Sequence, residues 1–114
     1  MSAIQKRLIE RSNNILENLT EFEDIIDLFS KKIFHALDQG NKILFCGNGG
    51  SAAESQHMAA EYCATLNHHN PRKGFKAIAL SVDTSFITAW SNDFGFDGIF
   101  ARQVAVSYTH LRAH

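Results

Sequence analysis

A histidine and a glutamate, His57 and Glu61, have the side chains whose types and spacing point most directly to chemistry. The segment from Ser51 to Leu66 around them has helix-forming composition, and residues at positions i and i+4 lie on one face of a helix. An imidazole and a carboxylate placed in this way suit two metal ligands, or a ligand and a base. The spacing is also typical of a surface ion pair or a capped core histidine. Two ligands do not complete a zinc site, which normally takes three or four.

The stretch CGNGGS, Cys46 to Ser51, comes directly before this predicted helix. Its glycines leave room for backbone N–H groups to face a bound anion or hydroxyl, and the N-terminus of the following helix adds the positive end of its dipole. The spacing matches neither G-x-G-x-x-G nor the phosphate loop that ends in Gly-Lys-Ser/Thr, which disfavours a nucleotide. Such a turn also occurs where a helix only packs closely on its neighbours, so both interpretations stay open.

A second polar pair, Asn92 and Asp93, stands in the stretch SNDFG. Asn and Asp favour turns, which is the simpler interpretation of this pair. The functional interpretation is that the two side chains bind the hydroxyl groups of a sugar.

Two apolar runs rich in strand formers, residues 42–46 and 76–80, flank the glycine turn and its helix. Strand, turn, helix and strand form a βαβ unit, in which the strands are parallel and buried. Ligands of open α/β sheets bind beyond the carboxyl ends of the strands, and the glycine turn lies at that edge. We predict further helices over residues 83–90 and 95–106.

The N-terminal residues 1–40 predict a helical hairpin suited to oligomerisation. Residues 3–19 have apolar side chains at helical spacing. Thr20 and Glu23 match a capping box that begins a second helix, which Gly40 closes. Residues 41–106 then form a partial α/β domain.

Charge and composition narrow the possible partners. Eleven basic and twelve acidic residues give a formal charge of −1 over 114 residues, so nothing supports binding to nucleic acid or to an anionic membrane. No apolar stretch approaches the roughly 20 residues that span a bilayer, and the N-terminus lacks the apolar centre of a signal peptide. We expect a cytoplasmic protein. Cys46 and Cys63 are too few for a disulfide framework, and we expect both to be buried as small hydrophobes.

The stretches CGNGGSAAESQHMAAEY and AIALSVDTSFITAWSNDFGFDGIFARQV strongly resemble the phosphoheptose isomerases, the sedoheptulose 7-phosphate isomerase branch of the SIS (sugar isomerase) superfamily. The resemblance runs from about Ile43 to Val104. It implies a flavodoxin-like SIS fold, with a parallel sheet and helices on both faces, in a homotetramer with active sites at subunit interfaces. It also implies conversion of sedoheptulose 7-phosphate to D-glycero-D-manno-heptose 7-phosphate, an early step towards lipopolysaccharide.

The resemblance also implies roles for particular residues. In that family the loop after the first strand and the second polar pair bind the substrate. The resemblance therefore implies the following substrate-binding residues: Asn48, Gly49, Gly50, Ser51, Glu61, Asn92 and Asp93. His57 and Glu61 match zinc ligands in members that carry one zinc ion per subunit, and they are the candidate catalytic residues. Aldose–ketose isomerisation moves a proton between adjacent carbons through an enediol, which requires a base, and we assign that base to Glu61.

Several features depart from the family pattern. The family's second half supplies the main phosphate loop, a Gln and a His that complete the site, so only the N-terminal half is present and we expect this chain alone to be inactive. Thr65 replaces the family's usual Arg. Residues 107–114 do not continue the pattern, and we interpret them as a non-native tail. An alternative function is that of a non-catalytic SIS-domain protein, which binds a replication initiator or senses a sugar phosphate.

Overall fold

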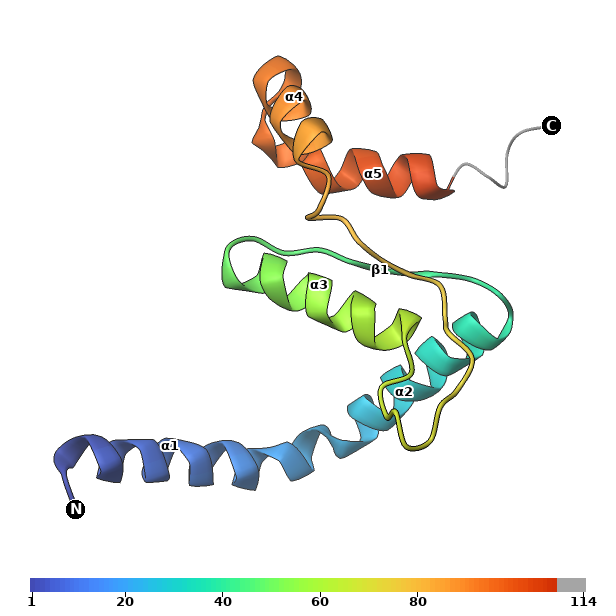
Figure 1. Cartoon of the computed structure of the whole chain (residues 1–114). Coiled ribbons are helices and arrows are strands. Elements are labelled where there is room, and N and C mark those ends of the chain that lie inside the picture. Colours follow the sequence, from blue (N-terminus) through green and yellow to red (C-terminus); the bar gives the residue numbers. More distant parts are fainter. Residues whose placement is uncertain (109–114) are drawn as a thin grey trace. The chain divides into compact units, whose positions relative to one another are not determined.

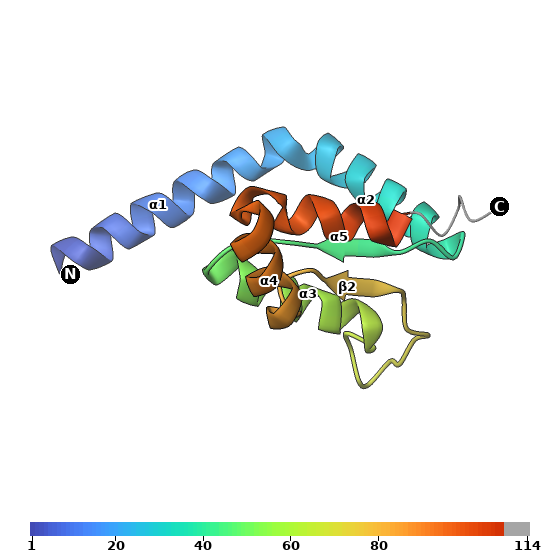
Figure 2. The same cartoon turned by 90° about the horizontal axis from the view of Figure 1, so that it is seen from above.

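Two short parallel strands, β1 (Ile43–Phe45) and β2 (Ala77–Ala79), form the sheet of the computed structural model. Their register places Ile43 opposite Ala77 and Phe45 opposite Ala79. The helix α3 (Gly50–Cys63) connects them and packs against both strands (Figures 1 and 2). Parallel strands need such a crossover because the chain must return to the opposite end of the sheet before the second strand begins, which a tight turn cannot do. The predicted βαβ unit is therefore confirmed.

The structure describes residues 1–108, which fall into two units divided between Ala36 and Leu37. The last six residues of the predicted tail lie outside the described part, whereas Ser107 and Tyr108 complete the helix α5 (Ile99–Tyr108).

The core of the second unit forms where α3 meets the sheet. Ala59 of α3 packs against Ala77 and Ala79 of β2, and the larger side chains of Ile43, Phe45 and Tyr62 surround them. The small alanines let the helix approach the strands closely, and the aromatic rings of Phe45 and Tyr62 lie 5.6 Å apart between their centroids. Burial of these apolar groups fixes the position of α3, and with it the position of His57 and Glu61.

The helix α4 (Thr84–Phe94) follows β2 and leads through a 3-10 turn, η2 (Phe96–Gly98), into α5. Its N-cap is Asp83, whose carboxylate accepts a hydrogen bond of 2.9 Å from the backbone N–H of Phe86. The helix is longer than predicted, because no residue with a special backbone conformation interrupts it before Gly95, which has φ +95°. Asn92 and Asp93 therefore belong to its last turn and do not follow it.

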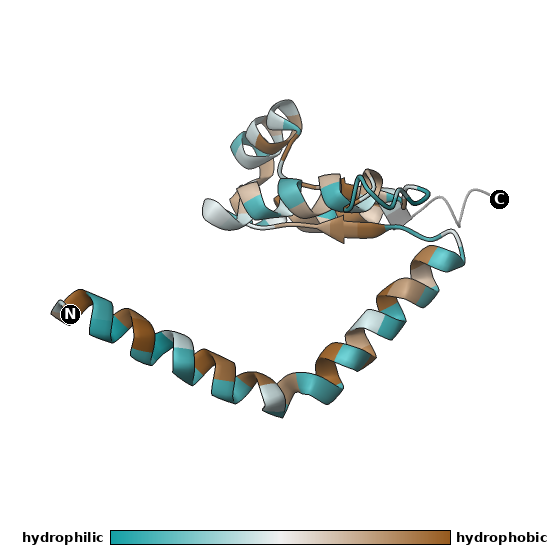
Figure 3. Cartoon of the chain, turned by 60° about the horizontal axis from the view of Figure 1, so that its bottom comes forward, coloured by the Kyte–Doolittle hydropathy of each residue, from teal (hydrophilic) through white to brown (hydrophobic). Residues whose placement is uncertain are grey.

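The first unit consists of α1 (Ala3–Leu19), a 3-10 turn η1 (Thr20–Phe22) and most of α2 (Glu23–Asp38). The backbone stays right-handed helical through Thr20 and Glu23, so the two helices meet at a bend and do not double back as a hairpin (Figure 3). The predicted capping box at Thr20 was wrong, since its hydroxyl donates to the carbonyl of Glu17 at 3.0 Å. A capping box instead begins α1, between Ser2 and Gln5.

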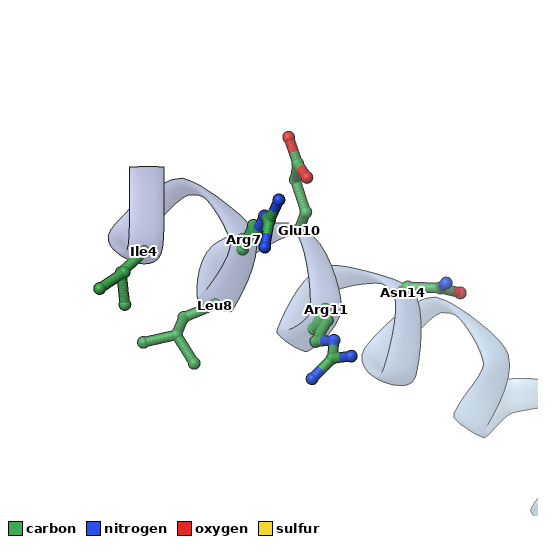
Figure 4. A pocket seen from close by; sticks show the side chains of 6 residues that line it. All are labelled: Ile4, Arg7, Leu8, Glu10, Arg11 and Asn14. Atoms are coloured by element: carbon green, nitrogen blue, oxygen red, sulfur yellow. The ribbon is translucent and has the colours of Figure 1, made fainter. Parts of the chain in front are cut away.

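Apolar side chains of α1 and α2 are exposed in this chain. They are Ile4, Leu8, Ile9, Ile15, Leu16, Leu19, Ile25, Ile26, Leu28, Phe29 and Phe34. The brown segments of both helices in Figure 3 mark where hydrophobic residues recur along them. A hollow on α1 is lined by Ile4, Arg7, Leu8, Glu10, Arg11 and Asn14. In Figure 4 the side chains of Ile4 and Leu8 point to one side of the helix, and that of Glu10 points to the other. Among residues 1–108, no helix combines the length and the apolar character that crossing a membrane requires.

Candidate functional site

The glycine turn joins the carboxyl end of β1 to the first turn of α3. The N–H of Ser51 donates to the carbonyl of Asn48 at 3.0 Å, and the N–H of Ala52 donates to the carbonyl of Gly49 at 3.1 Å. Gly49 has φ +57° and ψ −122°, a backbone conformation that side chains disfavour. The turn is thus built tightly around the start of the helix.

The three glycines of this turn serve different purposes. A Cβ on Gly47 would lie 2.6 Å from the Cβ of Ser51 and 2.7 Å from its carbonyl carbon, so Gly47 permits close packing against α3. A Cβ on Gly49 or Gly50 would meet nothing within 4 Å. The backbone N–H groups of Gly49 and Gly50 also have no acceptor among the described residues. The packing interpretation therefore holds at Gly47, and space beside free N–H donors remains at Gly49 and Gly50.

His57 and Glu61 come together on α3, as their spacing predicted. The Nε2 atom of His57 lies 3.4 Å from the Oε1 atom of Glu61, with side-chain exposures of 72% and 36%. The structure therefore contains the ion-pair geometry, with both groups open to solvent and to a ligand. The buried, capped histidine that we considered is excluded by the exposure of His57.

The same distance is compatible with two ligands of one zinc ion. Two donors that each lie about 2.0–2.1 Å from zinc in a tetrahedron are about 3.3–3.4 Å apart, and the Nε2–Oε1 separation matches that edge. Within residues 1–108, however, no three His, Cys, Asp or Glu side chains gather as a metal-binding group. The two donors fit zinc in type and spacing, but they do not form a complete site among residues 1–108.

Asn92 and Asp93 bond to each other at the far end of α4. The amide nitrogen of Asn92 donates to Oδ1 of Asp93 at 3.0 Å, and both residues are exposed. Within residues 1–108 neither has a hydrogen bond or ion pair to the glycine turn, His57 or Glu61. The structure thus groups Asn48–Ser51 with α3 and leaves the second polar pair separate.

Two serines that sequence reasoning missed hold the turn in place. The hydroxyl of Ser81, just after β2, donates to the carbonyl of Ala52 at 3.1 Å and ties the end of this strand to the start of α3. The hydroxyl of buried Ser55 donates to the carbonyl of Ser51 at 2.7 Å. Serine side chains commonly bond to nearby carbonyls, but no spacing in the sequence identifies the partner of Ser81.

The prediction that both cysteines are buried was wrong. Cys46 and Cys63 are free and exposed. Cys46 directly follows β1 at the open edge of the sheet, and Cys63 is the last residue of α3, where its thiol donates to the carbonyl of Ala77 at 3.2 Å. Both lie at ends of elements, where packing on a two-stranded sheet leaves side chains uncovered.

Arg72 is a further residue that sequence reasoning missed, because the polar stretch 67–74 predicts only a connecting loop. Its guanidinium donates to the carbonyls of Glu61, Tyr62 and Lys73 at 2.8, 3.1 and 3.0 Å. The C-terminal carbonyls of a helix lack partners within the helix, and a cation placed there also interacts favourably with the helix dipole. Arg72 therefore caps the C-terminus of α3.

Comparison with known proteins places this geometry in a family. The family model described as the SIS domain matches residues 8–112. The phosphoheptose isomerase of Aliarcobacter butzleri is 44% identical over 103 residues, which are 90% of this chain and 53% of that protein. The phosphoheptose isomerase of Helicobacter pylori is 41% identical over 101 residues, 89% of this chain and 52% of that protein. The chain thus spans about half the length of these relatives.

Solved structures agree with the sequence relatives. A phosphoheptose isomerase from Francisella tularensis has a TM-score of 0.76 at 32% identity. The match covers 92% of this chain and 56% of the solved chain. The enzyme from Neisseria gonorrhoeae has a TM-score of 0.68 at 35% identity over 91% of this chain and 54% of the solved one. The parallel strands, the crossover helix and the flanking helices are those of this fold, and the chain belongs to the SIS domain family.

Proposed function

We propose that the chain is the N-terminal part of a cytoplasmic phosphoheptose isomerase, which converts sedoheptulose 7-phosphate to D-glycero-D-manno-heptose 7-phosphate for lipopolysaccharide precursors. The observation that carries the proposal is the His57–Glu61 pair at 3.4 Å, on the helix that directly follows the glycine turn. Similarity to phosphoheptose isomerases over about nine-tenths of the chain supports the substrate class.

Glu61 is suited to move the proton between C1 and C2 of the sugar. Its Oε1 atom faces His57, whereas its Oε2 atom has no partner among the described residues and is available to take a proton. In this proposal His57, which lies one turn earlier on α3, orients the carboxylate through its 3.4 Å approach to Oε1. The base of an isomerase must reach the carbon-bound proton, and its exposure on the open face of α3 permits that approach.

The glycine turn provides the second half of the proposed site. The N–H groups of Gly49 and Gly50 lack acceptors within residues 1–108, and they stand at the N-terminus of α3, where the helix dipole favours an anionic or strongly polar ligand group. In this proposal they bind the substrate together with Asn48 and Ser51. The placement of Asn92 and Asp93 at the substrate remains a prediction from the resemblance.

We also propose that His57 and Glu61 bind one zinc ion in the complete site. Zinc supplies a Lewis acid that polarises the substrate carbonyl. The match between the 3.4 Å separation and two tetrahedral ligands supports this assignment. The other ligands come from outside the described residues, since no group of three suitable side chains exists within them.

A homotetrameric assembly belongs to the same proposal. The exposed apolar side chains of α1 and α2 form an extended apolar surface, and surfaces of that kind mark protein–protein contacts. Association of subunits through these helices would cover it.

The decisive experiment is turnover of sedoheptulose 7-phosphate by the full-length protein encoded by the gene, with the sugar phosphates separated by chromatography. We expect conversion by the wild type and a fall in kcat of about 10²- to 10⁴-fold for Glu61→Gln, the range for loss of a general base. Glu17→Gln makes the same chemical change at an exposed position of α1 and should leave kcat unchanged.

Three results would contradict the proposal. Normal turnover by Glu61→Gln would show that Glu61 is not the base that transfers the proton. Binding of sedoheptulose 7-phosphate by the wild type without conversion would favour a sugar phosphate sensor. Absence of both binding and conversion would favour the non-catalytic SIS-domain alternative.

A further inference from the structure

The C-terminal turn of α3 is held by contacts that come from the loop after it. Arg72 donates one bond to the carbonyl of Glu61 and another to that of Tyr62, at 2.8 and 3.1 Å. Its guanidinium carbon lies 4.7 Å from the centroid of the Phe75 ring, and the N–H of Phe75 donates to the same Tyr62 carbonyl at 3.0 Å. The N–H of Arg72 donates to the hydroxyl of Thr65 at 3.0 Å. The guanidinium is thus held between the carbonyls at the end of α3 and the ring of Phe75.

Glu61 depends on this turn because α3 ends at Cys63. A residue so close to a helix end lies where helices fray, since the last carbonyls have no intrahelical donor. His57 lies one turn earlier, in the helix interior. Fraying would therefore move the Glu61 carboxylate relative to the His57 imidazole and break the 3.4 Å approach between them.

The loop leaves little freedom for another arrangement. A Cβ on Gly74 would lie 2.4 Å from the carbonyl oxygen of Cys63, so the chain passes directly against the helix end. Two of the last carbonyls of α3 accept from Arg72: that of Glu61 accepts from the guanidinium alone, and that of Tyr62 accepts from the N–H of Phe75 as well. A guanidinium suits this role because its rigid fork presents several donors at once, whereas an ammonium is a compact group on a flexible stem.

We propose that Arg72 is a positioning residue for Glu61: by capping the last turn of α3, it holds the carboxylate against His57 in the geometry that proton transfer requires. The expected effect of Arg72 on the reaction rate rests on the proposed function. Its expected effect on the positions of His57 and Glu61 does not, because it follows from their geometry alone. Arg72 acts through Glu61 and does not itself contact the substrate in this proposal.

The first test is a kinetic double-mutant cycle in the full-length protein. We expect Arg72→Gln to lower kcat for sedoheptulose 7-phosphate by about 10- to 100-fold, with KM little changed, as for groups that orient a catalytic side chain. In the Glu61→Gln background the same change should lower the residual kcat less than about twofold, because residues acting as one unit are non-additive. Arg72→Lys should recover part of the rate.

The matched control is Lys73→Gln, which removes a neighbouring cation from the same loop. Within residues 1–108 the Lys73 side chain has no hydrogen bond or ion pair, so its kcat should match that of the wild type. An equal loss of kcat for Arg72→Gln in both backgrounds would overturn the positioning role and leave a general structural one. Unchanged kcat for Arg72→Gln with Glu61 present would overturn it as well.

A second measurement does not depend on turnover. In the NMR spectrum of the full-length protein, Glu61→Gln should shift the His57 ring Cε1 signal when Arg72 is present, and leave it in place in the Arg72→Gln variant. A shift of equal size in both would refute the inference, whatever the activity. If the wild type fails to isomerise the sugar phosphate, the proposed function fails, and this measurement alone decides whether Arg72 positions Glu61.

Discussion

Substitution of Gly47 by alanine tests how the glycine turn is built. The new Cβ would lie 2.6–2.7 Å from the Cβ, C and O atoms of Ser51, well inside the 3.5–4.0 Å at which carbon atoms pack best. Two of these three atoms are backbone. The clash therefore displaces the first turn of α3 and cannot be relieved by rotating a side chain.

The magnitude follows from two opposing effects. Overpacking of this kind costs about 1–3 kcal/mol, whereas replacing glycine restricts the unfolded chain and returns about 0.4–1 kcal/mol. We expect Gly47→Ala to lower the free energy of unfolding by about 1–2 kcal/mol. Gly50→Ala is the matched control, because a Cβ there meets nothing within 4 Å and its φ is not left-handed. It should gain about 0.4–1 kcal/mol through the same effect on the unfolded chain.

Urea unfolding of the full-length protein, followed by circular dichroism, measures both variants against the wild type. The proposed ligand contact adds a second readout, since Gly50→Ala places a methyl group beside the free N–H donors and should raise KM for the sugar phosphate without loss of stability. Equal unfolding midpoints for Gly47→Ala and the wild type would refute the packing argument. A destabilised Gly50→Ala would show that the open space beside this residue is filled.

Two further predictions concern the end of the chain after β2. Asp83→Ala removes the N-cap of α4 and should cost about 1 kcal/mol of the free energy of unfolding, which urea unfolding measures; Asp83→Asn, which keeps a capping oxygen, should lose much less, and an equal loss for both would argue against the cap. Gly98→Ala would place a Cβ 2.7 Å from Nε1 of Trp90, whose ring is stacked on that of Phe86 and tilted against that of Phe94. It should destabilise the protein by about 1–3 kcal/mol and shift the fluorescence of Trp90, the single tryptophan of the chain; an unchanged spectrum and midpoint would contradict this contact.

Local patterns in the sequence determined the elements and the family. The apolar runs at residues 42–46 and 76–80 predicted the two strands, and the helical composition after the glycines predicted α3, because hydrophobic periodicity and turn residues act over a few neighbouring positions. The i, i+4 spacing of His57 and Glu61 was enough to predict that they meet, since a helix fixes that distance by itself. Two distinctive stretches, one around the glycine turn and one over residues 77–104, were enough to identify the SIS family.

Tertiary structure alone decided the contacts between segments. The sequence gives no reason to assign different roles to the three glycines of the turn. Only the close approach of the Ser51 backbone shows that Gly47 has no room for a side chain, whereas Gly50 has room. The exposure of Cys46 depends on what packs over the edge of the sheet, and no periodicity encodes it. Arg72 reaches the end of α3 because the loop folds back against Cys63, a path set by three-dimensional packing. Such contacts join residues with no repeating spacing, so they exist only once the chain has folded.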